Sequence, residues 1–198
     1  MADQTFTSGQ ILTAAQMTTL QGNSGLVVVT PTGVTGGTIS GSTVTIGAGV
    51  SSVAVAGAFS SSFDSYKIII NSGVASATEG LALILTGSVT GYYAGEARVR
   101  YDTGAVSGVG YNNSSAWEIC RVNTDTISCS FELINPFVAK PTIITGSGND
   151  TRVSAGTSAR QYTGVHTVAS SFSGFTITPG SPVTLTGGTI RVYGYRNS

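Results

Sequence analysis

Charged side chains are scarce in this chain. Its 198 residues include nine Lys and Arg and nine Asp and Glu, so charged residues make up 9% of the chain and the formal net charge is zero. Soluble domains usually carry about 25% charged residues. A neutral chain has no basic field to hold nucleic acid or an anionic membrane surface. We therefore expect neither nucleic acid nor a membrane as a partner.

Long apolar runs and cysteines are also rare. No stretch approaches the roughly 18 to 20 apolar residues that a membrane-spanning helix needs. The first twenty residues lack the basic and apolar regions of a signal peptide. These absences favour folding in a reducing cytoplasm, in which the two cysteines, Cys120 and Cys129, remain thiols.

Residues that carry chemistry are few and scattered. The single histidine is His166, and the chain has no motif of a serine hydrolase, a zinc protease or a thiol redox protein. We interpret His166 as a half-buried strand residue; the alternative is a metal held by His166 of three copies on a threefold axis. A glycosidase pair of carboxylates from distant strands stays open. We expect no catalytic residue, cofactor or metal.

Small and hydroxylated residues are abundant instead. The chain contains 26 Ser, 28 Thr and 27 Gly, and 40% of its residues are hydrophobic, which is enough to form a core. Thr, Val and Ile favour strands, whereas Gly and Ser favour turns. A weakly charged surface protects strand edges poorly against association. We therefore expect an all-β protein that forms oligomers.

A short helix is predicted near the start, over residues 14 to 21. Thr13 is placed to be its N-cap, and Gln16 stands three residues later, so the two can form a capping box. Leu12 is spaced to pack on Met17, and Gly22 offers a stop. Isolated helices are marginal in water below roughly 12 to 15 residues. The helix therefore needs a surface, either the body of the chain or a partner.

We interpret residues 1–25 as an attachment segment that contains this helix. The residues expected to make the contacts are Phe6, Ile11, Leu12, Thr13, Met17 and Leu20.

The rest of the chain reads as β-structure. Residues 26–49 are rich in Gly and Thr and are expected to form a neck or edge strands, with a loose boundary near 49. From 50 to 198, about eight short strands recur at roughly ten-residue spacing, which is typical of an antiparallel β-sandwich of the jelly-roll kind. Residues 126–133 alternate, so that Ile127, Cys129, Phe131 and Leu133 share one face.

Two registers are open for a hairpin that contains both cysteines. A two-residue turn places Cys120 opposite Cys129. A three-residue turn at 123–125 places Trp117 opposite Phe131 and turns Cys120 away. The second register gathers more apolar surface on one face, and we favour it.

Aromatic residues gather in two polar stretches that we predict to be long loops, 90–104 and 107–115, and Trp117 follows shortly after the second. Aromatic rings beside Asn and Ser in loops suit stacking on sugar rings or contact with proteins, since they give a large contact area with little loss of rotamer freedom. The competing interpretation is packing within the loops or against a neighbouring subunit. The candidate receptor contacts are Tyr92, Tyr93, Tyr111, Asn112 and Trp117.

The opening sequence TFTSGQILTAAQMTTLQ resembles the start of many bacteriophage tail fibres and minor tail proteins. The residues that carry the match are Phe6, Gly9, Leu12, Thr13, Ala14, Ala15 and Met17. The body, including the ending TGGTIRVYGYR, looks more loosely like the C-terminal β-domains of phage fibres. The resemblance implies a homotrimer in the virion, attached to other virion proteins by its N-terminus and binding a host surface glycan or protein.

The resulting hypothesis is a virion protein without enzymatic activity, a tail or side fibre. A capsid head fibre or decoration protein is the first alternative. A glycan depolymerase is the second, and the short chain without a long repetitive β-helix speaks against it.

Overall fold

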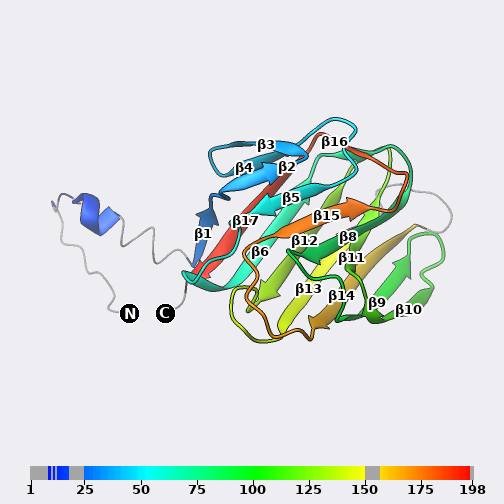
Figure 1. The fold of residues 1–198 in the computed structure, drawn as a ribbon. Coiled ribbons are helices and arrows are strands. Elements are labelled where there is room, and N and C mark those ends of the chain that lie inside the picture. The colour runs from blue at the N-terminus through cyan, green and yellow to red at the C-terminus, as the bar shows by residue number, and fades with distance from the viewer. Residues whose placement is uncertain (1–8, 10, 12, 18–24, 150–156, 197–198) are drawn as a thin grey trace.

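The computed structural model describes residues 9, 11, 13–17, 25–149 and 157–196. The strands of these residues form two facing antiparallel sheets, and in Figure 1 the smaller sheet crosses in front of the larger one. The predicted all-β antiparallel sandwich is confirmed. Residues 14–17 form one short helical turn.

The large sheet has ten strands. Nine follow the order β10-β9-β14-β13-β12-β6-β17-β4-β3, and β1 pairs with β17 beside this path. Their bounds are β1 (Leu26–Val29), β3 (Gly37–Ser40), β4 (Thr43–Ile46), β6 (Phe63–Asn71), β9 (Tyr92–Arg100), β10 (Val106–Ser114), β12 (Ser128–Ile134), β13 (Thr142–Asn149), β14 (Ser158–His166) and β17 (Thr189–Arg196).

The small sheet has five strands in the order β11-β8-β15-β5-β2. Their bounds are β2 (Gly33–Thr35), β5 (Val53–Ala56), β8 (Glu79–Leu85), β11 (Trp117–Val122) and β15 (Phe175–Pro179). A third pair, β7 (Val74–Ala75) with β16 (Leu185–Thr186), lies at one end of the sandwich.

The core lies between the two sheets and follows the alternation of the strands. Leu81, Leu83 and Leu85 of β8 are fully buried. From the large sheet, the side chains predicted to share one face of residues 126–133 are all buried: Ile127, Cys129, Phe131 and Leu133. Successive side chains of a strand point to opposite faces, so the intervening residues lie on the outer face of the sheet.

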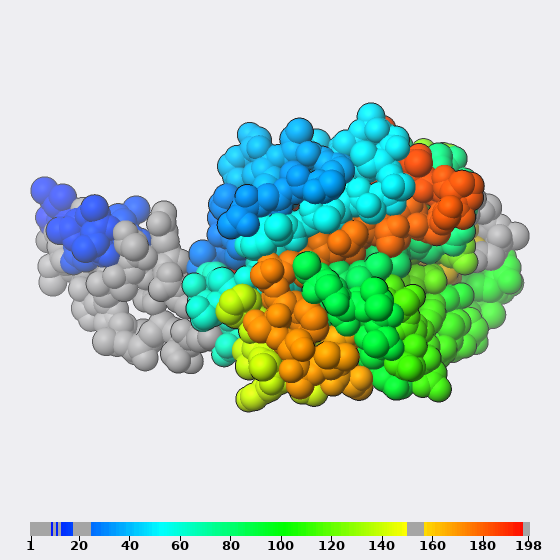
Figure 2. All heavy atoms as spheres, in the orientation of Figure 1, coloured from blue at the N-terminus to red at the C-terminus, as the bar shows by residue number. Residues whose placement is uncertain are grey.

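Residues 26–49 are built into the sandwich. β1, β3 and β4 belong to the large sheet and β2 to the small one, and Val44 and Ile46 are core residues. Figure 2 shows the blue and cyan N-terminal strands packed directly against the orange C-terminal segment. Of the two predicted arrangements, the structure has strands within the sheets, with β2 and β3 at sheet edges. The boundary predicted near 49 is wrong, because the segments on both sides of it share one core.

The predicted hairpin of the two cysteines is wrong in both registers. β11 pairs with β8 in the small sheet, whereas β12 pairs with β6 and β13 in the large one. Residues 123–127 cross between the sheets instead of turning back. Asn123 is buried, and its side-chain oxygen accepts hydrogen bonds from the backbone N–H groups of Asp125 at 2.7 Å and Thr126 at 3.3 Å, which shapes the crossing.

The loops predicted at 90–104 and 107–115 are mostly strands. They contain β9 and β10, which form a hairpin at one end of the large sheet (Figure 1). The glycine and polar residues of these strands gave no strand signal. Three of the nine residues of β9 and six of the nine of β10 are exposed, and neither strand shows a clear apolar alternation.

Candidate functional site

The outer face of the large sheet carries a broad groove. Its volume is about 910 Å³, and it crosses strands β6, β12, β13, β14, β9 and β10. The lining side chains on the outer face are mostly short hydroxyl and amide groups: Ser130, Thr145, Ser147, Gln161 and Thr163. These groups both donate and accept hydrogen bonds without carrying charge.

The strand register explains why these side chains meet. Glu132 pairs with Thr145, Thr145 with Thr163, and Thr163 with Gly95, so one row runs straight across four strands. The next row on the same face joins Ser130, Ser147, Gln161 and Ala97 in the same way. Gly95 and Ala97 leave the β9 end of the groove shallow and open.

The groove has a charged end on β6 and β12. Lys67 Nζ lies 4.0 Å from Glu132 Oε1, and the hydroxyl of Tyr195 donates a hydrogen bond to the same carboxylate. Burial, together with this bond to Glu132, raises the pKa of Tyr195 to about 12, so the phenol stays neutral at physiological pH. The opposite charges of Lys67 and Glu132 leave the groove as a whole uncharged.

A lateral line of mostly apolar side chains borders the groove. We call it the apolar row, and it consists, strand by strand, of Leu26, Tyr195, Ser65, Ile134, Ile143, Val165 and Tyr93. Ile134 and Ile143 are 36% and 41% exposed. The solvent face of an antiparallel sheet is normally polar. An apolar row beside hydroxyl rows makes this face suited to a ligand with both apolar and hydroxyl surfaces.

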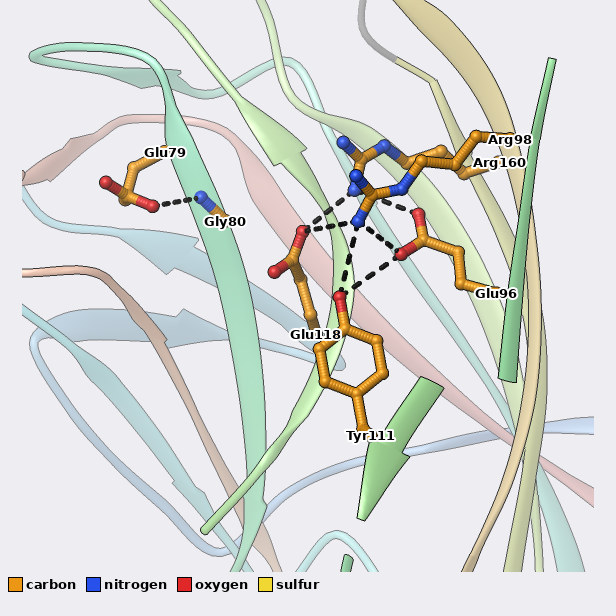
Figure 3. A network of polar contacts seen from close by, with 7 residues as sticks. All are labelled: Glu79, Gly80, Glu96, Arg98, Tyr111, Glu118 and Arg160. Carbon is orange, nitrogen blue, oxygen red and sulfur yellow. Dashed lines mark hydrogen bonds and ion pairs between the residues drawn. The ribbon is translucent and has the colours of Figure 1, made fainter. Parts of the chain in front are cut away.

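A second polar cluster lies on the inner face of β9, near the end of the small sheet (Figure 3). Arg160 Nη1 lies 2.9 Å from Glu96 and 2.8 Å from Glu118, and Arg98 donates to Glu96 at 2.8 Å. The hydroxyl of Tyr111 donates to Glu96 at 3.2 Å. Two arginines and two carboxylates balance each other, so the cluster ties β9, β14 and β11 together without net charge.

Burial and the neighbouring carboxylates Glu118 and Glu96 raise the pKa of Tyr111 to about 12. The Nε atoms of Arg98 and Arg160 are buried without a hydrogen-bond partner. Each carboxylate of this cluster has an arginine nitrogen within 2.9 Å. This pairing indicates that the cluster has a structural role and holds the strands together.

The five candidate receptor residues do not share one surface. Tyr92 and Trp117 are fully buried in the core, with their rings edge to face at 5.0 Å, so their prediction as surface contacts is wrong. Tyr111 belongs to the inner charged cluster, and Asn112 is exposed on β10. Tyr93, at the end of the apolar row, lies on the groove side. Adjacent residues of a strand face opposite sides, which separates Tyr92 from Tyr93.

His166 is more deeply buried than predicted. Its exposed fraction is zero, and its Nε2 lies 2.7 Å from Ser88 Oγ and 3.0 Å from the carbonyl of Thr90. Burial lowers the pKa of His166. A metal shared by three copies would need this ring at the surface, so that alternative is wrong. Among the described residues, no group of three or more His, Cys, Asp or Glu side chains is placed to hold a metal.

Cys120 and Cys129 are buried free thiols that approach each other from opposite sheets. The hydrogen bond to Cys129 and burial raise the pKa of Cys120 well above its usual value. Gly148 makes room for them, because a Cβ at this position would lie 2.5 Å from Cys120 Cβ.

The N-terminal helix is capped as predicted. The backbone N–H of Gln16 donates to Thr13 Oγ1 at 3.3 Å, and the N–H of Thr13 donates to Gln16 Oε1 at 2.9 Å. Ile11 is 88% exposed and Met17 46% exposed. The other predicted anchor residues, Phe6, Leu12 and Leu20, and helix residues 18–21 lie outside the described part of the chain.

Sequence reasoning missed the groove itself. Its members come from six strands, and no single segment contains more than three of them in a row. The alternating Ser, Thr and Gln positions of β12, β13 and β14 were the available signal.

No family model matches the chain, and no curated protein matches it. In the described residues, no helix has the length and apolar character needed to cross a membrane.

Proposed function

We propose that this chain is a structural virion protein whose large sheet binds a host surface glycan and whose N-terminal segment attaches it to the particle. The observation that carries the proposal is the groove of about 910 Å³, whose hydroxyl and amide side chains lie beside one Lys67–Glu132 pair of opposite charge. Sugars present hydroxyl groups on their edges and C–H groups on their ring faces. The two polar rows and the adjacent apolar row offer partners for both.

The N-terminal segment supports the attachment part of the proposal. A capped helix with Ile11 and Met17 exposed has an apolar side that needs a partner surface. The resemblance to phage tail fibres supports a partner in the virion, on the tail or, as the alternative, on the capsid.

Binding of the labelled protein to cells of the host bacterium tests the receptor part. The variant Thr145→Arg puts a large charged side chain in the groove, and we expect at least a tenfold loss of binding. The matched control Thr35→Arg alters an exposed threonine of the small sheet and should bind normally. Periodate treatment of the cells, which destroys sugar diols, should abolish binding, whereas protease treatment should not.

Wild-type protein that fails to bind host cells would contradict the receptor assignment and favour a decoration role on the capsid. Equal loss of binding in Thr145→Arg and Thr35→Arg would contradict the groove as the binding site.

A further inference from the structure

Strand β10 forms an unusual free edge of the large sheet. It pairs with β9 on one side, and no described strand pairs with its other side. Its nine residues, VSGVGYNNS, contain no charged residue and no proline. Proteins usually protect exposed edges with charges, prolines, short strands or covering elements. The sequence of this edge provides no charge and no proline, and its one irregularity is the register shift between Tyr111 and Ser114, beyond residues 106–110.

The register identifies which backbone groups face outward. The N–H of Arg100 donates to the carbonyl of Ala105 at 3.0 Å, which makes these two residues a hydrogen-bonded pair. Hydrogen-bonded and non-hydrogen-bonded pairs alternate along an antiparallel ladder. The backbone groups of Val106, Gly108 and Gly110 therefore point away from β9, toward the open edge.

No contact or backbone angle within one copy of the chain requires glycine at positions 108 and 110. A Cβ added at Gly110 would meet nothing within 4 Å, and one at Gly108 would meet only the Glu96 carbonyl at 3.9 Å. Neither has a positive φ. Glycine inside a strand is less favourable than alanine by roughly 0.5–1 kcal/mol, and it often marks a place where another backbone approaches.

We propose that β10 pairs with β10 of a second copy of this chain, antiparallel and about a twofold axis at Gly108. The other free edge of the strand path is β3, with four residues, so it matches the nine residues of β10 poorly. Two copies of β10 match in length, and neither brings a charge to the contact.

The pattern of large and small residues in β10 is complementary to itself in this register. Val106, which is 74% exposed, lies opposite Gly110 of the other copy, so a side chain covers a bare backbone. Ser107 lies opposite Val109 on the other face. Backbone hydrogen bonds form at Val106, Gly108 and Gly110, the positions whose groups are free in one copy.

Pairing within the plane of the sheet leaves the outer face uncovered. The grooves of the two copies then lie on one continuous face, with their β10 ends adjacent. A glycan chain long enough to reach both grooves would bind with avidity. The pairing itself does not depend on the nature of the ligand, and its twofold symmetry differs from the threefold assembly that the resemblance implies.

Cysteine cross-linking tests the axis. In Gly108→Cys, the two new thiols face each other across the axis with Cα atoms about 5.5 Å apart, within the range for a disulfide. We expect mild oxidation to give a covalent dimer linked at position 108, identified by peptide mapping. Gly95→Cys, one strand inward on the same face, is the matched control and should stay monomeric on a denaturing gel.

Mass measurement in solution tests the interface. We expect light scattering to give two copies for the wild type, and Val106→Lys to weaken the dimer at least tenfold with an unchanged circular dichroism spectrum. Thr38→Lys on β3 should leave the dimer intact. A monomer at all concentrations, a trimer insensitive to Val106→Lys, or a Gly95→Cys dimer as abundant as that of Gly108→Cys would overturn the proposal.

Discussion

His166 is a single buried residue whose protonation links the stability of the fold to pH. Its ring contacts Tyr92 and Phe172, with ring centroids 4.4 Å and 5.2 Å away, and its Nε2 is held by Ser88 and Thr90. Its Nδ1 is buried without a hydrogen-bond partner. Burial disfavours the charged ring more than the polar interactions with the backbone of Thr90 and Val168 favour it, so the neutral ring is the favoured form in the folded protein.

Acidification should therefore destabilise the folded chain through His166. Because burial lowers its pKa below the ordinary value of 6.5, the unfolded chain takes up a proton at a pH at which the folded chain does not. We expect the free energy of unfolding to be unaffected by this group above about pH 7 and to fall below pH 6.5, by at most about 1.4 kcal/mol per pH unit.

Urea unfolding at pH 7.5, 6.5 and 5.5 measures this effect, with His166→Gln as the comparison. The variant should have a lower stability at pH 7.5 and a flatter dependence on pH. Parallel curves for the two proteins would show that His166 does not titrate differently on folding.

At the scale of the elements, the charged cluster of Figure 3 holds strands from both sheets. Arg160 of β14 is 6% exposed and bridges Glu96 of β9 and Glu118 of β11. Removing one partner of a buried ion pair leaves an uncompensated charge, which typically costs about 3–5 kcal/mol. Exposed pairs contribute about 0–1 kcal/mol.

Arg160→Met should therefore destabilise the protein by roughly 3 kcal/mol or more, because Glu96, which is only 2% exposed, and Glu118 would then share one arginine, Arg98. Arg100→Met is the matched control, since Arg100 pairs with Asp102 at 2.7 Å in a setting where their side chains are 41% and 34% exposed. We expect it to cost much less than Arg160→Met, because solvent screens an exposed ion pair. Denaturant unfolding of both variants at pH 7 gives the comparison, and equal losses would refute the structural role of the cluster.

At the scale of the whole molecule, we expect the sandwich and the N-terminal segment to have separate functions. The first described strand of the large sheet begins at Leu26, whose partner is Tyr195, so the strands that the structure describes all lie after residue 25. A protein that lacks residues 1–24 keeps every described strand.

Deletion of residues 1–24 should abolish incorporation into virus particles and leave the unfolding temperature of the sandwich within about 2 °C of the full chain. Calorimetry and immunoblots of purified particles measure the two effects. A truncated protein that still enters particles would refute the anchor, and one that fails to fold would show that the segment is part of the sandwich.

Local patterns in the sequence were enough to predict the all-β class, the alternation of residues 127 to 133 and the Thr13–Gln16 cap. Each depends on residues a few positions apart, whose relative geometry is set by the strand or helix itself. These predictions hold because the local signal and the final packing agree.

The tertiary structure alone decided which strands are neighbours. β11 and β12 are separated by five residues in sequence but belong to different sheets, and no local pattern distinguishes that crossing from a hairpin. The burial of Tyr92 and Trp117, the apolar row and the groove follow from pairings between distant segments. Those pairings are selected by burial of the whole core. A short stretch of sequence carries no information about the distant segments that complete the core.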